Sequence, residues 1–243
     1  MSESTFPLRR LLPDPGEVDA AHAVDGIGFA DLAPPDRPYI VLNMIMAADG
    51  HATFEGRSGG LAIDRADRTL FLALRDQVDA VLAGTGTLSA EGYRRLIRDP
   101  ERRAAREARG LAADPLAVVL SRSGRIPDVP MLTDPDQPSA VYTGDDADPA
   151  AALHDLRARH GIRSLLCEGG PTLNAGLLAE GLVDELFLSV SPLLIGGPAK
   201  PAVEGWPLPE PARLDITSML EHDGTLFLRY RIRPPSGSLP ADG

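Results

Sequence analysis

The chain has 243 residues, of which 43% are apolar, and its formal net charge at pH 7 is −11. Such an acidic balance argues against nucleic acid or an anionic membrane as the main partner, since both attract basic proteins. The single cysteine, Cys167, excludes an intramolecular disulfide and disfavours a cysteine-based zinc site. A polar N-terminus and the lack of a long apolar run predict a soluble, cytoplasmic protein.

The first part of the chain divides into an arm, a strand and a helix. Residues 1–37 are rich in Pro, Gly and Asp, so we expect an arm packed over the body. Residues 39–47 are apolar almost throughout, which predicts a strand covered on both faces, as in parallel or mixed sheets. A helix is then predicted from Asp64, its N-terminal cap, to about Gln77.

Strands and helices alternate through the middle of the chain. Strands are predicted at residues 79–83, 116–120, 140–143 and 165–166, and helices at residues 100–110, 148–160 and 172–180. The first of these helices is expected to turn its arginines and glutamates to water. The second is expected to be capped by Asp148, and the third to end at Gly181.

The C-terminal part predicts strands at 184–192, 213–221 and 225–232, with His222-Asp223-Gly224 as the turn of the last pair. The tail, 234–243, is predicted to be disordered. We therefore expect one α/β domain over residues 38–233, with a mixed, mainly parallel sheet flanked by helices and a C-terminal antiparallel hairpin. The apolar strands 186–190 and 226–228 could supply a dimer face, and we expect a homodimer.

Three predicted strands end in loops that suit phosphate groups, namely Gly84-Thr85-Gly86-Thr87, Ser121-Arg122-Ser123 and Glu168-Gly169-Gly170-Pro171-Thr172. In open α/β sheets, ligands bind beyond the carboxyl ends of strands. Free N–H groups at a helix start and an arginine after a strand both attract phosphate. Together the loops predict a dinucleotide site, and Arg122 favours NADP over NAD. The Rossmann glycine fingerprint is absent.

Some other positions allow two interpretations, and the absence of certain motifs argues against several classes of enzyme. Asp49-Gly50 could be only a turn, and residues 57–60 could be a mobile loop over a substrate. Arg75 could be a surface residue with a buried stem or a ligand. The histidines show no metal-ligand spacing, and the deaminase, hydrolase and P-loop motifs are absent, so zinc deaminases, hydrolases and kinases are disfavoured.

The order of these motifs resembles the pyrimidine reductase of riboflavin biosynthesis, the C-terminal half of a bifunctional deaminase–reductase. The motifs that carry the resemblance are Asn43-Met44, Ala48-Asp49-Gly50, Gly56-Arg57-Ser58-Gly59-Gly60, Leu74-Arg75, residues 79–87, Glu168-Gly169-Gly170-Pro171-Thr172-Leu173, residues 182–186 and residues 192–197. The match covers roughly Pro38 to Ile232 and implies the dihydrofolate-reductase-like fold. Because the deaminase half is missing, the chain is similar to the stand-alone reductases of high-GC actinobacteria.

The resemblance implies an NADPH-dependent oxidoreductase that reduces 5-amino-6-(5-phosphoribosylamino)uracil to its ribitylamino form, with hydride transfer to C1′ of the sugar. It implies cofactor contacts at Ala48, Thr85, Thr87, Ser121, Arg122, Gly169, Gly170, Pro171, Thr172 and Leu173. It implies substrate contacts at Ser58, Arg75, Arg98 and Glu168. A metal is not expected.

Physical reasoning assigns roles within that set. Glu168 is expected to point away from the cofactor phosphates and to accept bonds from the N–H groups of the pyrimidine. Arginines on the opposite wall are expected to hold the 5′-phosphate. Asp49 is the candidate for proton movement at the sugar. Residues 51, 60–61 and 91–93 depart from the usual family pattern on the substrate side, which leaves open a dihydrofolate or other pterin reductase, or a non-catalytic nucleotide-binding protein.

Overall fold

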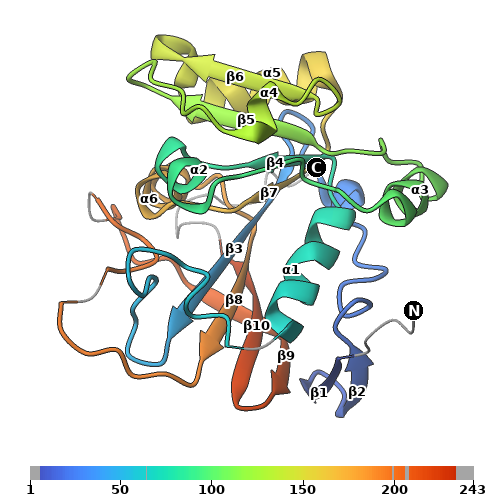
Figure 1. Cartoon of the computed structure of the whole chain (residues 1–243), viewed down its shortest axis with the longest axis vertical. Coiled ribbons are helices and arrows are strands. Elements are labelled where there is room, and N and C mark those ends of the chain that lie inside the picture. The colour runs from blue at the N-terminus through green and yellow to red at the C-terminus, as the bar shows by residue number, and fades with distance from the viewer. Residues whose placement is uncertain (1–5, 64, 199, 206–207, 234–243) are drawn as a thin grey trace, which may run out of the picture.

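The computed structural model describes residues 6–63, 65–198, 200–205 and 208–233, and in these residues ten strands form one mixed sheet (Figure 1). The strands are β1 (Pro7–Leu12), β2 (Gly16–Asp19), β3 (Tyr39–Ala47), β4 (Ala80–Leu82), β5 (Leu116–Ser121), β6 (Ser139–Thr143), β7 (Ser164–Cys167), β8 (Glu185–Ser191), β9 (Leu214–His222) and β10 (Thr225–Ile232). Their order in the sheet is β2-β1-β9-β10-β8-β3-β7-β4-β5-β6.

The sheet has a parallel part and an antiparallel part. Strands β8, β3, β7, β4, β5 and β6 run parallel to one another, and β10, β9, β1 and β2 are antiparallel to their neighbours. Every residue of β4 and β7 is buried, as expected for strands covered on both faces. The turn between β9 and β10 has positive φ at Asp223 and Gly224, as a two-residue hairpin requires. The predicted mixed, mainly parallel fold with a C-terminal hairpin is therefore confirmed.

Helices cover both faces of the parallel part. The helices are α1 (Arg65–Asp76), α2 (Thr85–Glu91), α3 (Pro100–Ala108), α4 (Pro130–Thr133), α5 (Pro149–His160) and α6 (Pro171–Ala179), with short 3-10 turns η1 (Phe29–Leu32) and η2 (Gly144–Ala147). Leu70 and Leu74 of α1 pack on one face of the sheet, and Leu156 of α5 and Leu177 of α6 pack on the other. In the described parts of the chain, no helix has the length and apolar character needed to cross a bilayer.

The sequence misjudged the N-terminal segment. Residues 7–19 form the hairpin β1–β2, and β1 pairs with β9, so the predicted arm extends the edge of the sheet (Figure 1). The strands escaped prediction because they are short and neither shows a regular alternation of apolar and polar residues; β2, the edge strand, has no fully buried residue. The predicted cap Asp64 and the predicted disordered tail lie outside the described residues.

Two of the other helix predictions need a comment. The Asp148 side chain accepts a hydrogen bond from the Ala151 N–H at 2.9 Å, so the predicted cap of α5 is confirmed. Helix α3, in contrast, does not turn all its arginines to water. Arg106 is completely buried and donates to the carbonyl oxygens of Arg75 and Ala112, which fixes α3 against the end of α1.

Candidate functional site

A cavity of about 640 Å³ lies at the carboxyl ends of β3, β4, β5 and β7. Because these four strands are parallel and adjacent, the segments that follow them meet at one edge of the sheet. The cavity has the size of a site for a small ligand or cofactor. Eight of the ten predicted cofactor residues line it, namely Thr85, Thr87, Ser121, Arg122, Gly170, Pro171, Thr172 and Leu173.

Glycines allow the ends of β4 and β7 to touch in the wall of this cavity. The Gly84 N–H donates to the carbonyl oxygen of Gly169 at 2.7 Å. That carbonyl belongs to the cis peptide bond between Gly169 and Gly170. A Cβ on Gly84 would lie 3.2 Å from the Gly170 nitrogen, and one on Gly170 would lie 2.9 Å from the Thr87 hydroxyl oxygen. The two backbones therefore form a closely packed surface with no side chains, against which a flat or bulky ligand group can lie.

Helix α6 begins at this surface. Its N-cap is Gly170, which has no side chain to accept a capping hydrogen bond. Pro171 occupies the first turn, where a backbone N–H has no helical partner. The N–H groups of the first turn are thus left for a ligand, and the helix dipole adds positive potential there. The arrangement suits a pyrophosphate.

The loop after β5 supplies hydroxyl groups and a cation to the far end of the cavity. The buried Ser121 hydroxyl donates to the carbonyl oxygen of Arg125 at 2.8 Å, which shapes the loop, and Arg122 and Ser123 are exposed beside it. A guanidinium and hydroxyls in one short loop can bind a phosphate monoester through charge-assisted hydrogen bonds.

Glu168 lies in the wall between β7 and the glycines, and its carboxylate is held by the buried Arg75 and the half-buried Tyr93. Arg75 donates from Nε to Oε1 at 2.7 Å and from Nη2 to Oε2 at 2.8 Å, and the Tyr93 hydroxyl donates to Oε2 at 2.6 Å. The Arg75 guanidinium also lies over the rings of Phe71 and Tyr93, at 4.4 and 5.4 Å from their centroids. Burial and the negative charge of Glu168 raise the pKa of Tyr93, so its hydroxyl stays protonated and donates.

This cluster corrects two expectations. Arg75 is neither a surface residue nor a free ligand, because its guanidinium is committed to Glu168 and its side chain is only 11% exposed. Glu168 does line the cavity, but three of its roughly four acceptor positions are taken by protein donors. What remains for a ligand is about one acceptor position on a carboxylate whose orientation is fixed.

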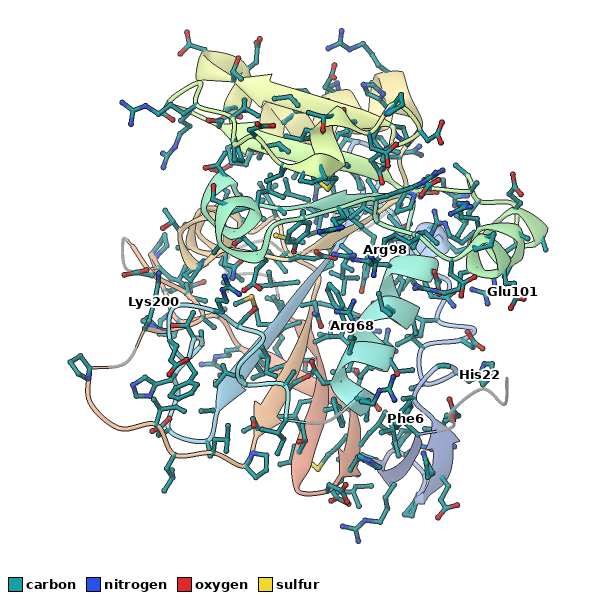
Figure 2. The ribbon with its side chains drawn as sticks, in the orientation of Figure 1. Phe6, His22, Arg68, Arg98, Glu101 and Lys200 are labelled. Atoms are coloured by element: carbon teal, nitrogen blue, oxygen red, sulfur yellow. The ribbon has the colours of Figure 1, made fainter. Side chains whose placement is uncertain are left out.

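Arg98 is exposed and is not among the residues that line the cavity; it lies beside the C-terminal end of α1 (Figure 2). The two residues before it, Leu96 and Ile97, are buried in the core, and Asp99 after it caps α3. The local chain therefore turns the Arg98 side chain outward. Its contact with the substrate stays a prediction.

Ser58 lines the cavity, as predicted, from the loop that follows β3. Its N–H and its hydroxyl both donate to Oε1 of Glu91, at 3.0 and 2.9 Å. Glu91 is the last residue of α2, so this contact ties the loop to the wall formed by α2.

Asp49, the residue predicted to assist proton movement at the sugar, fixes a loop through its carboxylate. Its Oδ2 accepts from the N–H groups of Ile195 and Gly196 at 2.7 and 2.8 Å, and its Oδ1 lies 2.9 Å from Nδ1 of His51. The Gly196 N–H, the His51 ring and the Ile195 N–H lower the pKa of Asp49 to about 2, against the opposing effect of its desolvation. At neutral pH the group is a carboxylate that fixes the loop after β8, and its part in proton movement stays a prediction.

Ala48 belongs to the same junction. Its N–H donates to the carbonyl oxygen of Leu193 at 3.0 Å, and it does not line the cavity. Gly169, the other predicted cofactor residue outside the lining, contributes through the backbone contact with Gly84 described above. The described residues contain no cluster of His, Cys, Asp or Glu able to hold a metal ion.

Sequence reasoning missed Lys200 and the roles of Tyr93 and Glu91. Lys200 lines the cavity from the loop between β8 and β9 (Figure 2). It is the single lysine of the chain, so a count of residue types would have drawn attention to it. Tyr93 contacts Glu168, which is 75 positions away in sequence, so no local sequence pattern predicts the role of Tyr93.

Comparisons with known proteins agree on one family. The family described as RibD C-terminal domain matches residues 38–227. A relative from Archaeoglobus fulgidus, named 2,5-diamino-6-ribosylamino-4(3H)-pyrimidinone 5′-phosphate reductase, is 28% identical over 188 residues, which are 69% of this chain and 86% of that protein. The riboflavin biosynthesis protein RibD of Mycobacterium tuberculosis is 29% identical over 163 residues, which are 66% of this chain and 44% of that protein.

Solved structures show the same fold. A pyrimidine reductase-like protein from Corynebacterium diphtheriae aligns with a TM-score of 0.70 and 20% identity, over 89% of this chain and 99% of that one. A deaminase/5-amino-6-(5-phosphoribosylamino)uracil reductase from Thermotoga maritima aligns with a TM-score of 0.65 and 18% identity, over 81% of this chain and 57% of that one.

Proposed function

Because the chain belongs to the RibD C-terminal domain family, we propose that it is a reductase of riboflavin biosynthesis that uses NADPH to reduce a 5′-phosphorylated ribosylaminopyrimidine. The first candidate substrate is 5-amino-6-(5-phosphoribosylamino)uracil, which becomes its ribitylamino form by hydride transfer to C1′ of the ring-opened sugar. The second is the 2,5-diaminopyrimidinone for which the Archaeoglobus relative is named.

The observation that carries this proposal is the single cavity in which the three strand-end loops meet Glu168. The residues present fit a dinucleotide. Gly84 and Gly170 pack with no room for a Cβ on either, the free N–H groups in the first turn of α6 would suit a pyrophosphate, and Arg122 with its neighbouring serines would suit a 2′-phosphate. When bound, NADPH supplies the hydride.

The remaining task of the protein is to orient the pyrimidine. Arg75 and Tyr93 hold the Glu168 side chain in one orientation, so its one remaining acceptor position can take a single N–H of the pyrimidine ring. A carboxylate beside the cofactor phosphates would repel them, and the two N–H donors of Arg75 turn it away from that side. Holding the hydride donor and the hydride acceptor in contact then contributes most of the rate acceleration.

Oxidation of NADPH, followed by absorbance with each candidate substrate, tests the proposal. Turnover of either ribosylaminopyrimidine supports it, whereas turnover of dihydrofolate alone identifies a pterin reductase. Cofactor binding without turnover of any of these identifies a nucleotide-binding protein. Arg122→Gln should raise the KM for NADPH by about tenfold to a hundredfold, the worth of a charge-assisted hydrogen bond, and leave the KM for NADH unchanged. Equal effects on both cofactors would contradict the assignment of Arg122.

We propose further that the chain forms a homodimer through the outer face of β8, β9 and β10. On β8 the side chains alternate between buried and half-buried, and the half-buried Leu188 lies opposite Leu228 of β10, which in turn lies opposite Met219 of β9. Helix α1 packs on the other face, against Phe187. Light scattering should give twice the monomer mass, and Leu188→Arg should halve it. The exposed Leu194, outside this face, supplies the control Leu194→Arg, which should not. A monomeric wild type would refute the proposal.

A further inference from the structure

A second cavity, of about 280 Å³, lies on the face of the sheet that α1 covers. It is enclosed by strands β1, β8, β9 and β10, by α1, and by the segment between β2 and η1, which runs beside α1 (Figure 1). It shares no lining residue with the cavity at the carboxyl ends of the parallel strands. Its volume is close to the lower end of the range for small-molecule sites, so it can hold a small organic ligand.

The walls of this second cavity are mostly apolar. Leu70 of α1, Phe187 of β8 and Phe227 of β10 all belong to the buried core and line it from two sides. Aromatic rings offer a large apolar surface on which another ring can pack. The walls therefore suit a ligand with an apolar, aromatic body.

One cationic side chain lines the second cavity without a partner. Arg10 of β1 lies directly opposite Leu220 of β9, a core residue, so the Arg10 side chain is on the α1 face of the sheet. Within the described ranges, no residue accepts a hydrogen bond from its guanidinium. Its Nε is enclosed by protein, and its terminal nitrogens are the ones left open to a ligand. The adjacent Arg9 is on the opposite face and donates to Glu221 at 3.0 Å.

The other charged side chains in this lining are already paired. Arg229 donates from Nε and Nη2 to the carboxylate of the buried Glu185, at 2.8 and 2.7 Å. Asp25 Oδ2 lies 2.9 Å from Nδ1 of His22. Of the charged residues described in the lining, Arg10 is therefore the one whose charge no neighbour balances. An anionic group on a ligand would be drawn to it.

We propose that the second cavity is an accessory binding site for a small aromatic carboxylic acid. The open end of the Arg10 guanidinium matches the two oxygens of a carboxylate, and the aromatic body packs against Phe187 and Phe227. A phosphate suits the site less well, because its second negative charge would meet one cation and apolar walls. The site is independent of which substrate is reduced in the first cavity.

Titration calorimetry with phenylacetate, with and without saturating NADPH, tests the proposal. Wild type should bind phenylacetate in both cases. The neutral phenylacetamide, which lacks the charge, and inorganic phosphate, which lacks the ring, should each bind at least about tenfold more weakly. Arg10→Met should weaken phenylacetate binding by about tenfold to a hundredfold, the worth of a charge-assisted hydrogen bond. Arg9→Met, the matched change on the opposite face, should bind as wild type does.

The comparison of phenylacetate with its amide uses the unaltered chain, so it decides the matter even if Arg10→Met does not fold. Circular dichroism checks the fold of both variants. An absence of phenylacetate binding by wild type, equal binding of the amide, or undiminished binding by a folded Arg10→Met would overturn the proposal. Loss of phenylacetate binding when NADPH is present would also overturn it, since that would place the acid in the first cavity.

Discussion

Replacing Arg75 by Met removes the cation that faces Glu168 and leaves most of the packing volume in place. The two side chains are 11% and 2% exposed, so water screens their attraction little. Removing one member of such a pair leaves a buried charge without a partner, at a cost of on the order of 3–5 kcal/mol. We expect Arg75→Met and Glu168→Gln each to lower the free energy of unfolding by about this amount.

The double variant, Arg75→Met with Glu168→Gln, measures the energy of interaction between the two side chains. With both charges gone, no buried charge is left unpaired, and its loss of stability should fall short of the sum of the two single losses by about 2–3 kcal/mol. For a chain of this size, 1 kcal/mol corresponds to roughly 2–4 °C in Tm, so the single variants should melt on the order of 10 °C lower. The exposed pair between Arg9 and Glu221, with side chains 66% and 21% exposed, supplies the control. Arg9→Met should cost less than about 1 kcal/mol.

Urea unfolding of the four proteins without cofactor, followed by circular dichroism, measures these differences. The m value must stay constant for the free energies to be comparable. Additive losses in the double variant would refute the reasoning. They would mean that Arg75 and Glu168 do not bind each other in solution, and that the Arg75 guanidinium is free to reach a substrate phosphate.

The remaining predictions concern Gly84, in the wall of the cavity, and Asp49, which fixes the loop after β8. Gly84→Ala should lower the free energy of unfolding by about 1–3 kcal/mol, because the new methyl would lie 3.2 Å from the Gly170 nitrogen. Gly176→Ala, where nothing lies within 4 Å, should not be destabilising in the same urea titration, and equal losses in both variants would contradict the close contact. Asp49→Asn should retain turnover, since the carboxylate fixes a loop and transfers no proton; a large fall in kcat would return Asp49 to the mechanism. The lowered pKa of Asp49 stabilises the fold above its ordinary value of 3.8, and this contribution is lost as the pH falls through about 2. The Tm difference between wild type and Asp49→Asn should therefore be constant near neutral pH and shrink in acid.

The parts of the fold that could be predicted are those in which neighbouring residues carry the information. The apolar runs of β3 and β7 and the capping aspartate of α5 are local patterns, and each corresponds to an element in the structure. The hairpin β1–β2 has no such pattern, because both strands are short and β2, at the edge of the sheet, is largely polar. Its place in the sheet depends on pairing with β9, some 200 residues later.

The same distinction divides the candidate site. The loops after β4, β5 and β7 could be assigned to a cofactor because glycines, hydroxyls and an arginine directly follow predicted strands. The partners of Glu168 could not be assigned, since Arg75 is 93 positions away and its apolar neighbours on α1 fit a surface arginine as well as a buried one. Only the packed structure decides which arginine is neutralised within the core and which cation is left for a ligand.

The strand order also separates the two ligands of the proposed reaction. The cofactor residues follow β4, β5 and β7, whereas Ser58 and Lys200 come from the loops after β3 and β8. The segment after β7 serves both, with Glu168 on one side and the start of α6 on the other. Substitutions in the loops after β3 and β8 should therefore alter the choice of pyrimidine without changing the affinity for the cofactor. Those at Glu168 or its partner Arg75 should disturb both, because the glycines proposed to bind the pyrophosphate directly follow the carboxylate proposed to orient the ring.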